Sequence, residues 1–128
     1  MTAIDNVECI TLFVPDLDSA KAFYEAVFCG NFIYEDETSA VLKLRNLMIN
    51  LLDERAAPEL IRPRPVGGPG APPRLPLTVL VDDVDACCVK LAERQVPILN
   101  GPIDRPWGRR TVAFLDPAGH AWELAHPL

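Results

Sequence analysis

The sequence predicts an α+β fold in which one βαβββ module occurs twice. Thr11 of the first copy matches Thr78 of the second, and Asp16 matches Asp83, so the copies are offset by 67 residues. In each copy the apolar spacing changes from a strand period to a helix period and back. A proline-rich stretch separates the copies. The predicted organisation is a first module at 1–57, a linker at 58–75 and a second module at 76–128, within one structural domain.

The first module is predicted to run strand, helix and three strands. Alternating apolar residues indicate a strand from Val7 to Val14, and Pro15 ends it. Apolar residues at helical spacing then predict a helix, with Asp18 or Ser19 as the N-cap and Gly30 near its end. The three following strands are predicted at 32–37, 40–44 and 47–52.

The stretch from Pro58 to Pro76 holds seven prolines and three glycines. Proline lacks a backbone N–H, so this stretch is predicted to be an exposed spacer with neither helix nor central strand. A docking sequence for proline-reading domains is the less favoured alternative, because no PxxP core repeats.

The second module is predicted to repeat the order. Its elements are a strand at 77–81, a helix at 84–94, a weak strand at 96–99, and strands at 110–115 and 121–126. Its end aligns with the end of the first module at an offset of 73 rather than 67. The extra residues are assigned to a loop at 101–108, and inserted loops often carry function.

Composition excludes several classes of protein. The chain has 128 residues, of which 49% are hydrophobic, and can bury one core. Its net charge of -6 argues against nucleic-acid binding. No apolar run is long enough to span a membrane and the N-terminus does not resemble an export signal, so a cytoplasmic protein is expected. The four cysteines are expected to be reduced, with Cys87 and Cys88 as small helix residues.

Two segments suggest a family. Val-Pro-Asp-Leu-Asp-Ser-Ala-Lys-Ala-Phe-Tyr opens the first module, and Trp107-Gly-Arg followed by Asp-Pro-Ala-Gly-His-Ala-Trp-Glu-Leu124 closes the second. The chain resembles the vicinal oxygen chelate superfamily, which includes glyoxalases, extradiol dioxygenases, fosfomycin-modifying enzymes and bleomycin resistance proteins. The resemblance implies that the two modules form a curled, cup-like mixed sheet with helices packed outside, commonly in a homodimer.

The resemblance also marks four positions where metalloenzymes of the family hold a metal. Here these positions are Cys9, Asn50, Pro76 and Glu123. Only Glu123 is a usual ligand, Pro76 has no side-chain donor, and a soft thiol beside a hard carboxylate suits no single metal. No metal cofactor is therefore expected. A divalent metal held by Glu123, Cys9 and water is the less favoured alternative.

Strand alternation applied to the cup predicts a lining of mostly small, apolar or neutral side chains. Trp107 is expected to stack on a planar ligand. For Glu123 three roles are open: binding a cation, pairing with Arg109, or serving as an acid or base. His120 is expected to hold its turn and His126 to lie on the surface. The predicted ligand-binding residues are Cys9, Phe13, Met48, Asn50, Trp107, Arg109 and Glu123.

The leading functional hypothesis is a metal-free binding protein that resembles the bleomycin-resistance branch. It would confer antibiotic resistance by sequestering a planar or cationic small molecule in the cup. The alternative is an enzyme, a divergent glyoxalase-like lyase or isomerase or a dioxygenase-related metalloenzyme, with Glu123 as the catalytic base. A nucleophilic Cys9 is disfavoured, since no histidine is expected on its face. A third hypothesis is a scaffold whose partner is another protein.

Overall fold

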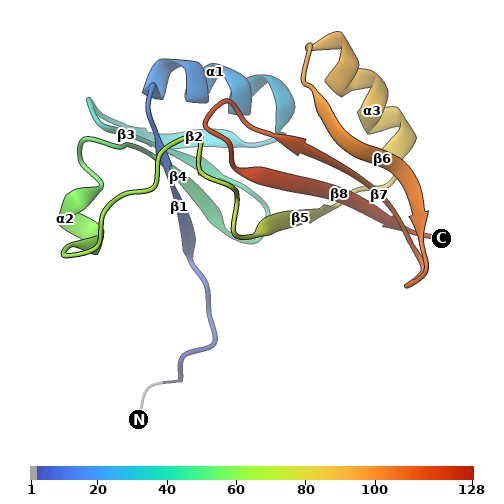
Figure 1. Cartoon of the computed structure of the whole chain (residues 1–128), viewed down its shortest axis with the longest axis horizontal. Coiled ribbons are helices and arrows are strands. Elements are labelled where there is room, and N and C mark those ends of the chain that lie inside the picture. The colour runs from blue at the N-terminus through green and yellow to red at the C-terminus, as the bar shows by residue number, and fades with distance from the viewer. Residues whose placement is uncertain (1–2) are drawn as a thin grey trace. The chain divides into compact units, whose positions relative to one another are not determined.

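The computed structural model describes residues 3–128. These residues form two compact units, and the boundary in the sequence lies between Gly67 and Gly68. Each unit contains a four-stranded mixed sheet with a helix of ten or eleven residues on one face, as Figure 1 shows. The α+β fold built from two βαβββ modules is therefore confirmed. None of the helices formed by residues 3–128 is long and apolar enough to cross a membrane.

The first unit has the strand order β1-β4-β3-β2. The β1–β4 pair is parallel, and the other two pairs are antiparallel. Its elements are β1 (Cys9–Val14), α1 (Leu17–Val27), β2 (Asn31–Glu35), β3 (Ser39–Lys43), β4 (Met48–Asp53) and α2 (Pro58–Ile61).

The second unit repeats this topology with the strand order β5-β8-β7-β6. Again the first pair, β5–β8, is parallel and the other two are antiparallel. Its elements are β5 (Pro76–Leu80), α3 (Val84–Glu93), β6 (Ile98–Arg105), β7 (Arg109–Leu115) and β8 (Ala121–Pro127). The shared strand order supports an internal duplication.

Equivalent aspartates begin the two long helices. The Asp16 carboxylate accepts a hydrogen bond from the Ser19 N–H, and Asp83 accepts one from the Ala86 N–H, each at 3.1 Å. Both caps have extended backbone, as N-cap residues do. The predicted cap at Asp18 or Ser19 is wrong, because the helix begins immediately after Asp16.

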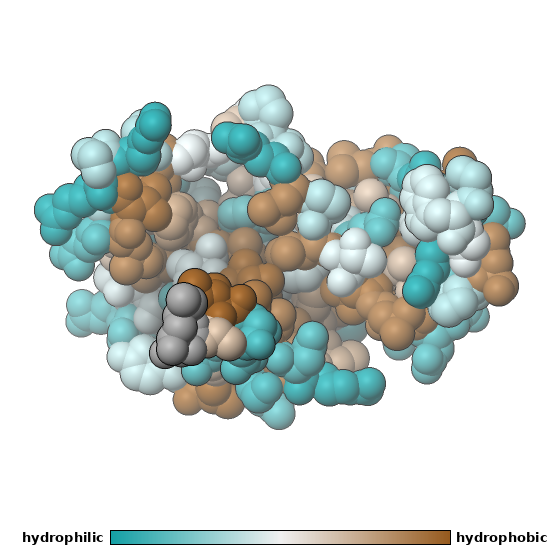
Figure 2. Space-filling view, turned by 90° about the horizontal axis from the view of Figure 1, so that it is seen from below, coloured by the Kyte–Doolittle hydropathy of each residue, from teal (hydrophilic) through white to brown (hydrophobic). Residues whose placement is uncertain are grey.

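Each unit buries the sheet face that its helix covers. In the first unit Leu51 and Tyr24 are fully buried, and in the second Phe114 and Val84 are. Neighbouring residues of a strand point their side chains to opposite faces of the sheet. The face that the helix does not cover is therefore free to form a binding site. Seen from below the view of Figure 1, the surface carries hydrophobic areas between hydrophilic ones (Figure 2).

The predicted loop at 101–108 is wrong, because most of it is strand. Strand β6 continues to Arg105, and the Gly108 N–H closes a tight turn on the Arg105 carbonyl at 3.1 Å. Register shifts between Ile98 and Ile103 absorb the extra residues. Gly101 makes this irregularity feasible: its φ is +94°, and a Cβ there would lie 2.4 Å from the Thr111 carbonyl oxygen.

The proline-rich stretch holds one short helix that the composition did not predict. Helix α2 starts at Pro58, a position where the missing N–H is tolerated. From Arg62 to Leu75 all residues except Val66 are exposed, as expected of a spacer.

Candidate functional site

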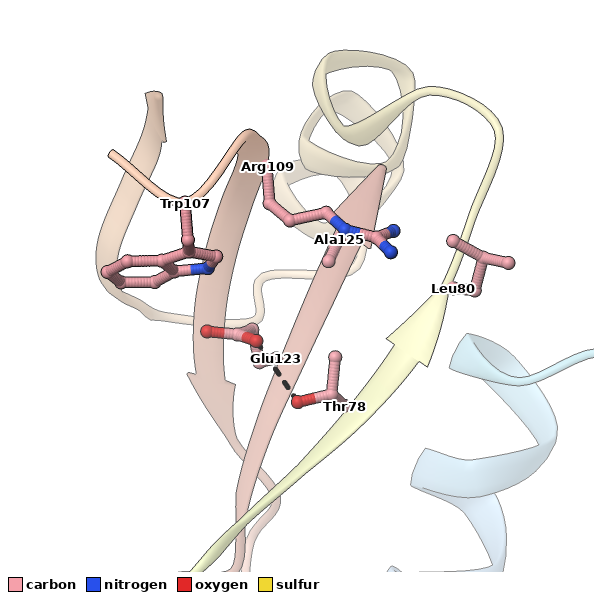
Figure 3. Close-up of a pocket in the computed structure, with 6 residues that line it drawn as sticks. All are labelled: Thr78, Leu80, Trp107, Arg109, Glu123 and Ala125. Carbon is pink, nitrogen blue, oxygen red and sulfur yellow. Dashed lines mark hydrogen bonds between the residues drawn. The ribbon is translucent and has the colours of Figure 1, made fainter. Parts of the chain in front are cut away.

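A pocket of about 390 Å³ opens on the second unit, on the sheet face that α3 leaves uncovered. Strands β5, β7 and β8 and the β6–β7 turn provide its walls (Figure 3). The lining residues are Thr78, Leu80, Trp107, Arg109, Glu123 and Ala125.

Strand register explains why these side chains meet. Thr78 lies beside Glu123 in the parallel β5–β8 pair. Ala125 lies two residues after Glu123 on β8, so its side chain points to the same face as Glu123. It lies opposite Thr111 of β7. Arg109 shares that side with Thr111, and the turn before it carries Trp107.

Glu123 lines the pocket and is half-buried. The Thr78 hydroxyl donates a hydrogen bond to its Oε1 at 3.0 Å. Within residues 3–128 its other oxygen, Oε2, has no hydrogen-bond partner, and it lies on the Trp107 side of the carboxylate in Figure 3. One acceptor is thus left for a ligand.

The predicted alternative of an ion pair between Glu123 and Arg109 is wrong. No such pair occurs among the described residues. In Figure 3 the Arg109 side chain extends past Ala125 toward Leu80, away from the carboxylate. The two charged groups therefore occupy different parts of the pocket.

Trp107 is exposed at the mouth of the pocket, with 65% of its surface accessible. The guanidinium carbon of Arg105 lies 5.7 Å from the centre of its ring, within cation–π distance. Arg105 was not among the predicted site residues, because the sequence pattern placed it in a loop. Once β6 is extended, its position opposite Arg109 across the hairpin identifies it.

The ligand-binding residues predicted in the first unit share one face of the β1–β4 pair. Cys9 lies beside Met48, and Phe13 follows on the same side of β1. The amide nitrogen of Asn50 lies 3.5 Å from the Thr11 hydroxyl oxygen, at the limit of a hydrogen bond. The Asn50 Oδ1 atom is buried and has no partner within residues 3–128.

The side chains at the family's metal positions do not fit a divalent metal. Pro76 offers no donor atom, and Asn50 offers one neutral amide oxygen. Across residues 3–128, no group of three or more histidine, cysteine, aspartate or glutamate side chains could hold a metal ion. Glu123 is the one carboxylate among the four positions, and Thr78 already occupies one of its oxygens.

Both histidines have structural roles outside the pocket. The His120 ring lies 2.8 Å from the buried Asp116 carboxylate, which also accepts the His120 N–H, so the predicted role in the turn is confirmed. His126 was predicted to be a surface residue, and this is wrong. Its Nδ1 accepts the Val84 N–H at 2.9 Å at the start of α3, and its side chain is half-buried.

Comparisons with known proteins agree with the fold. The chain shares 24% identity over 121 residues with metallothiol transferase FosB from Lysinibacillus sphaericus, covering 94% of this chain and 82% of that protein. The fold matches a glyoxalase/bleomycin resistance protein/dioxygenase from Nocardioides with a TM-score of 0.86 and 18% identity, over 100% of this chain and 87% of the other. TnmS3, an antibiotic binding protein from Streptomyces sp. CB03234, matches with a TM-score of 0.75 and 27% identity over 100% of both chains.

The sequence also matches the model of one family across nearly its whole length, from residue 6 to residue 124. That span includes most of both modules, the whole linker and every residue of the pocket except Ala125. The protein therefore belongs to the Glyoxalase/Bleomycin resistance protein/Dioxygenase superfamily.

Proposed function

We propose that this protein binds and sequesters a small planar molecule without a metal, as an antibiotic-binding protein would. The observation that carries the proposal is an exposed tryptophan beside a carboxylate with an unused oxygen, in one pocket. Similarity to TnmS3, an antibiotic binding protein, supports the same class of function.

Each pocket residue has a physical role in this proposal. Stacking on Trp107 would contribute roughly 0.5–1.5 kcal/mol beyond the burial of ring area. Leu80 and Ala125 supply apolar surface. The free oxygen of Glu123 accepts a hydrogen bond from an amine, amide or cationic group of the ligand, so a planar or cationic molecule suits the site.

A second candidate is an enzyme of the glyoxalase-like lyase or isomerase type, or one related to dioxygenases. The similarity to FosB, a metallothiol transferase, favours it. In that case Glu123 would act as the base, since it is the one carboxylate in the pocket. The metal positions argue against this candidate, because Pro76 and Asn50 replace ligands that the chemistry needs.

Calorimetric titration with metal-free bleomycin, which carries a planar bithiazole and a cationic tail, tests the first proposal. We expect Trp107→Ala and Glu123→Gln each to weaken binding about tenfold or more, because each removes a major contact. Glu93→Gln, a charge change on the exposed surface of α3, is the matched control and should bind like the wild type. If both pocket variants also bind like the wild type, the site is misplaced.

Metal analysis separates the two candidates. The protein is incubated with nickel, zinc, manganese and ferrous iron, desalted and measured by elemental mass spectrometry beside Glu123→Ala. Near-stoichiometric metal that is lost in the variant, with chelator-sensitive turnover of the methylglyoxal–glutathione hemithioacetal, would favour the enzyme. We also propose a homodimer, which light scattering on the eluted protein would detect as twice the 14.1 kDa chain mass.

A further inference from the structure

We propose that the pocket recognises an anionic group on its ligand, which binds at Arg109 with Arg105 contributing positive charge from the opposite strand. The ligand class is then a planar molecule that carries an acid at one end and a hydrogen-bond donor at the other. This inference rests on the proposed function and adds the charge of the ligand.

The first support is the pairing of two like charges. Arg105 at the end of β6 and Arg109 at the start of β7 are direct partners in the antiparallel register. Side chains of such partners lie on the same face, and like charges directly opposite each other destabilise a hairpin. The hairpin therefore brings two positive charges to the face of the sheet that carries the pocket, which favours an anion there.

The second support is that Arg105 is fixed in place. Its Nε donates to the Thr111 hydroxyl at 3.0 Å, and its Nη2 donates to the Asn100 side-chain oxygen at 2.9 Å. Neither partner is charged, and Arg105 has no counterion among residues 3–128. The same guanidinium lies over the Trp107 ring, so Arg105 also positions the tryptophan.

The third support is that Arg109 has no counterion. Among residues 3–128 its side chain makes no hydrogen bond or ion pair, although it is part of the pocket. Its neighbour Arg110 differs in this respect. Arg110 points to the other side of β7, where Asp85 binds it through two hydrogen bonds and Asp104 binds it at 2.8 Å.

These positions set the polarity of the ligand. In Figure 3 the Glu123 carboxylate lies toward Trp107 and Thr78, and the Arg109 guanidinium lies toward Leu80. The Arg109 cation and the Glu123 carboxylate are therefore separated, while Arg105 lies over the Trp107 ring. A ligand with its donor at Glu123 and its acid at Arg109 would complement both.

Two fluorescent probes that differ only in this charge test the inference: 6-amino-2-naphthoate and 6-amino-2-naphthamide. They share the planar ring and the amine, but only the first carries an acid. We expect the wild type to bind the naphthoate about ten- to a hundredfold more tightly, as charge-assisted hydrogen bonds imply. Added salt should reduce this preference, because the site is open to solvent.

Variants assign the preference to residues. Arg109→Gln should remove the preference for the acid, because it should weaken binding of the naphthoate far more than binding of the naphthamide. Arg105→Gln should weaken both probes, because it also releases Trp107. Arg94→Gln, at the exposed C-terminal end of α3, is the matched control and should change neither.

Failure of this inference differs from failure of the proposed function. Equal binding of both probes, tighter binding of the naphthamide, or loss of both probes while bleomycin still binds would overturn the anionic group and leave the binding protein. If bleomycin and both probes all fail to bind, both proposals are overturned.

Discussion

Thr78 donates a hydrogen bond to Glu123 across the β5–β8 pair, and Thr11 lies at the same register position beside Asn50 across the β1–β4 pair. The duplication has therefore kept the threonine and changed its partner. The second unit presents a carboxylate with a free oxygen at this position. The first unit presents a neutral amide whose own oxygen is buried and has no hydrogen-bond partner within residues 3–128.

The unpartnered oxygen of Asn50 leads to a stability prediction. A buried acceptor without a partner destabilises a fold by about 1–3 kcal/mol, and replacing it with an apolar group of similar shape removes that penalty. We therefore expect Asn50→Leu to be neutral or to raise the free energy of unfolding by about 1 kcal/mol. Urea denaturation measures this change.

Thr78→Val is the matched comparison in the other copy. It removes a hydrogen bond to a charged group, so a loss of about 1 kcal/mol is expected, partly offset by the strand preference of valine. Destabilisation by Asn50→Leu as large as that of Thr78→Val would show that the Asn50 oxygen has a partner in solution.

The two N-caps should contribute equally, because they are equivalent in the duplication. Asp16→Ala and Asp83→Ala each remove the acceptor of one backbone N–H at the first turn of a helix. Each should lower the free energy of unfolding by about 1 kcal/mol. Asp18→Ala serves as the control: Asp18 lies within the first turn of α1 and is not the cap, so its effect should be smaller. An equal loss for Asp18 would place the helix start two residues later.

Much of the fold could be predicted from the sequence because the two copies share local signals. Strand alternation and helical spacing located all eight strands and both long helices to within a few residues, apart from the end of β6. Strand alternation also placed Arg109 and Glu123 on one face of the second sheet, where they now line a pocket with Trp107.

The predictions that were wrong depend on contacts between residues distant in sequence or on local backbone irregularities, and neither is visible in residue spacing. The end of β6 was missed because Gly101 and the register shifts break its alternation, and Arg105 was lost with it. The role of His126 was missed because its partner, the Val84 N–H, is 42 residues away. A prediction from spacing alone also could not show that Arg109 turns away from Glu123.

Stability should depend on pH through Asp36 in the first unit. The Tyr34 hydroxyl donates to its carboxylate at 2.7 Å, and the Thr38 and Ser39 N–H groups each donate at 2.9 Å. These bonds hold the pKa of Asp36 well below its ordinary value of 3.8, with the tyrosine bond the largest cause. A depressed pKa in the folded state stabilises the fold above the unfolded value, and this contribution is lost as the pH falls through the folded value.

Urea midpoints from about pH 7 down to about pH 2 would measure this contribution. We expect Asp36→Asn to be less stable than the wild type at neutral pH and the difference to shrink in acid. Glu37→Gln is the control, an exposed neighbour with no hydrogen bond among residues 3–128. A constant difference between Asp36→Asn and the wild type at every pH would show that the carboxylate charge does not matter.

The four cysteines are all free and should differ in their reactivity. Burial raises the pKa of the Cys88 thiol, and the nearby carboxylate of Asp85 raises it further, so little thiolate forms there. Cys29, just after α1, is exposed.

In timed alkylation with iodoacetamide at about pH 8, followed by peptide mass spectrometry, we expect Cys29 to react first and Cys88 much more slowly. Asp85→Asn removes one cause of the raised pKa and should accelerate Cys88 without changing Cys29. Modification of Cys88 as fast as that of Cys29 in the wild type would mean that α3 opens readily from its sheet.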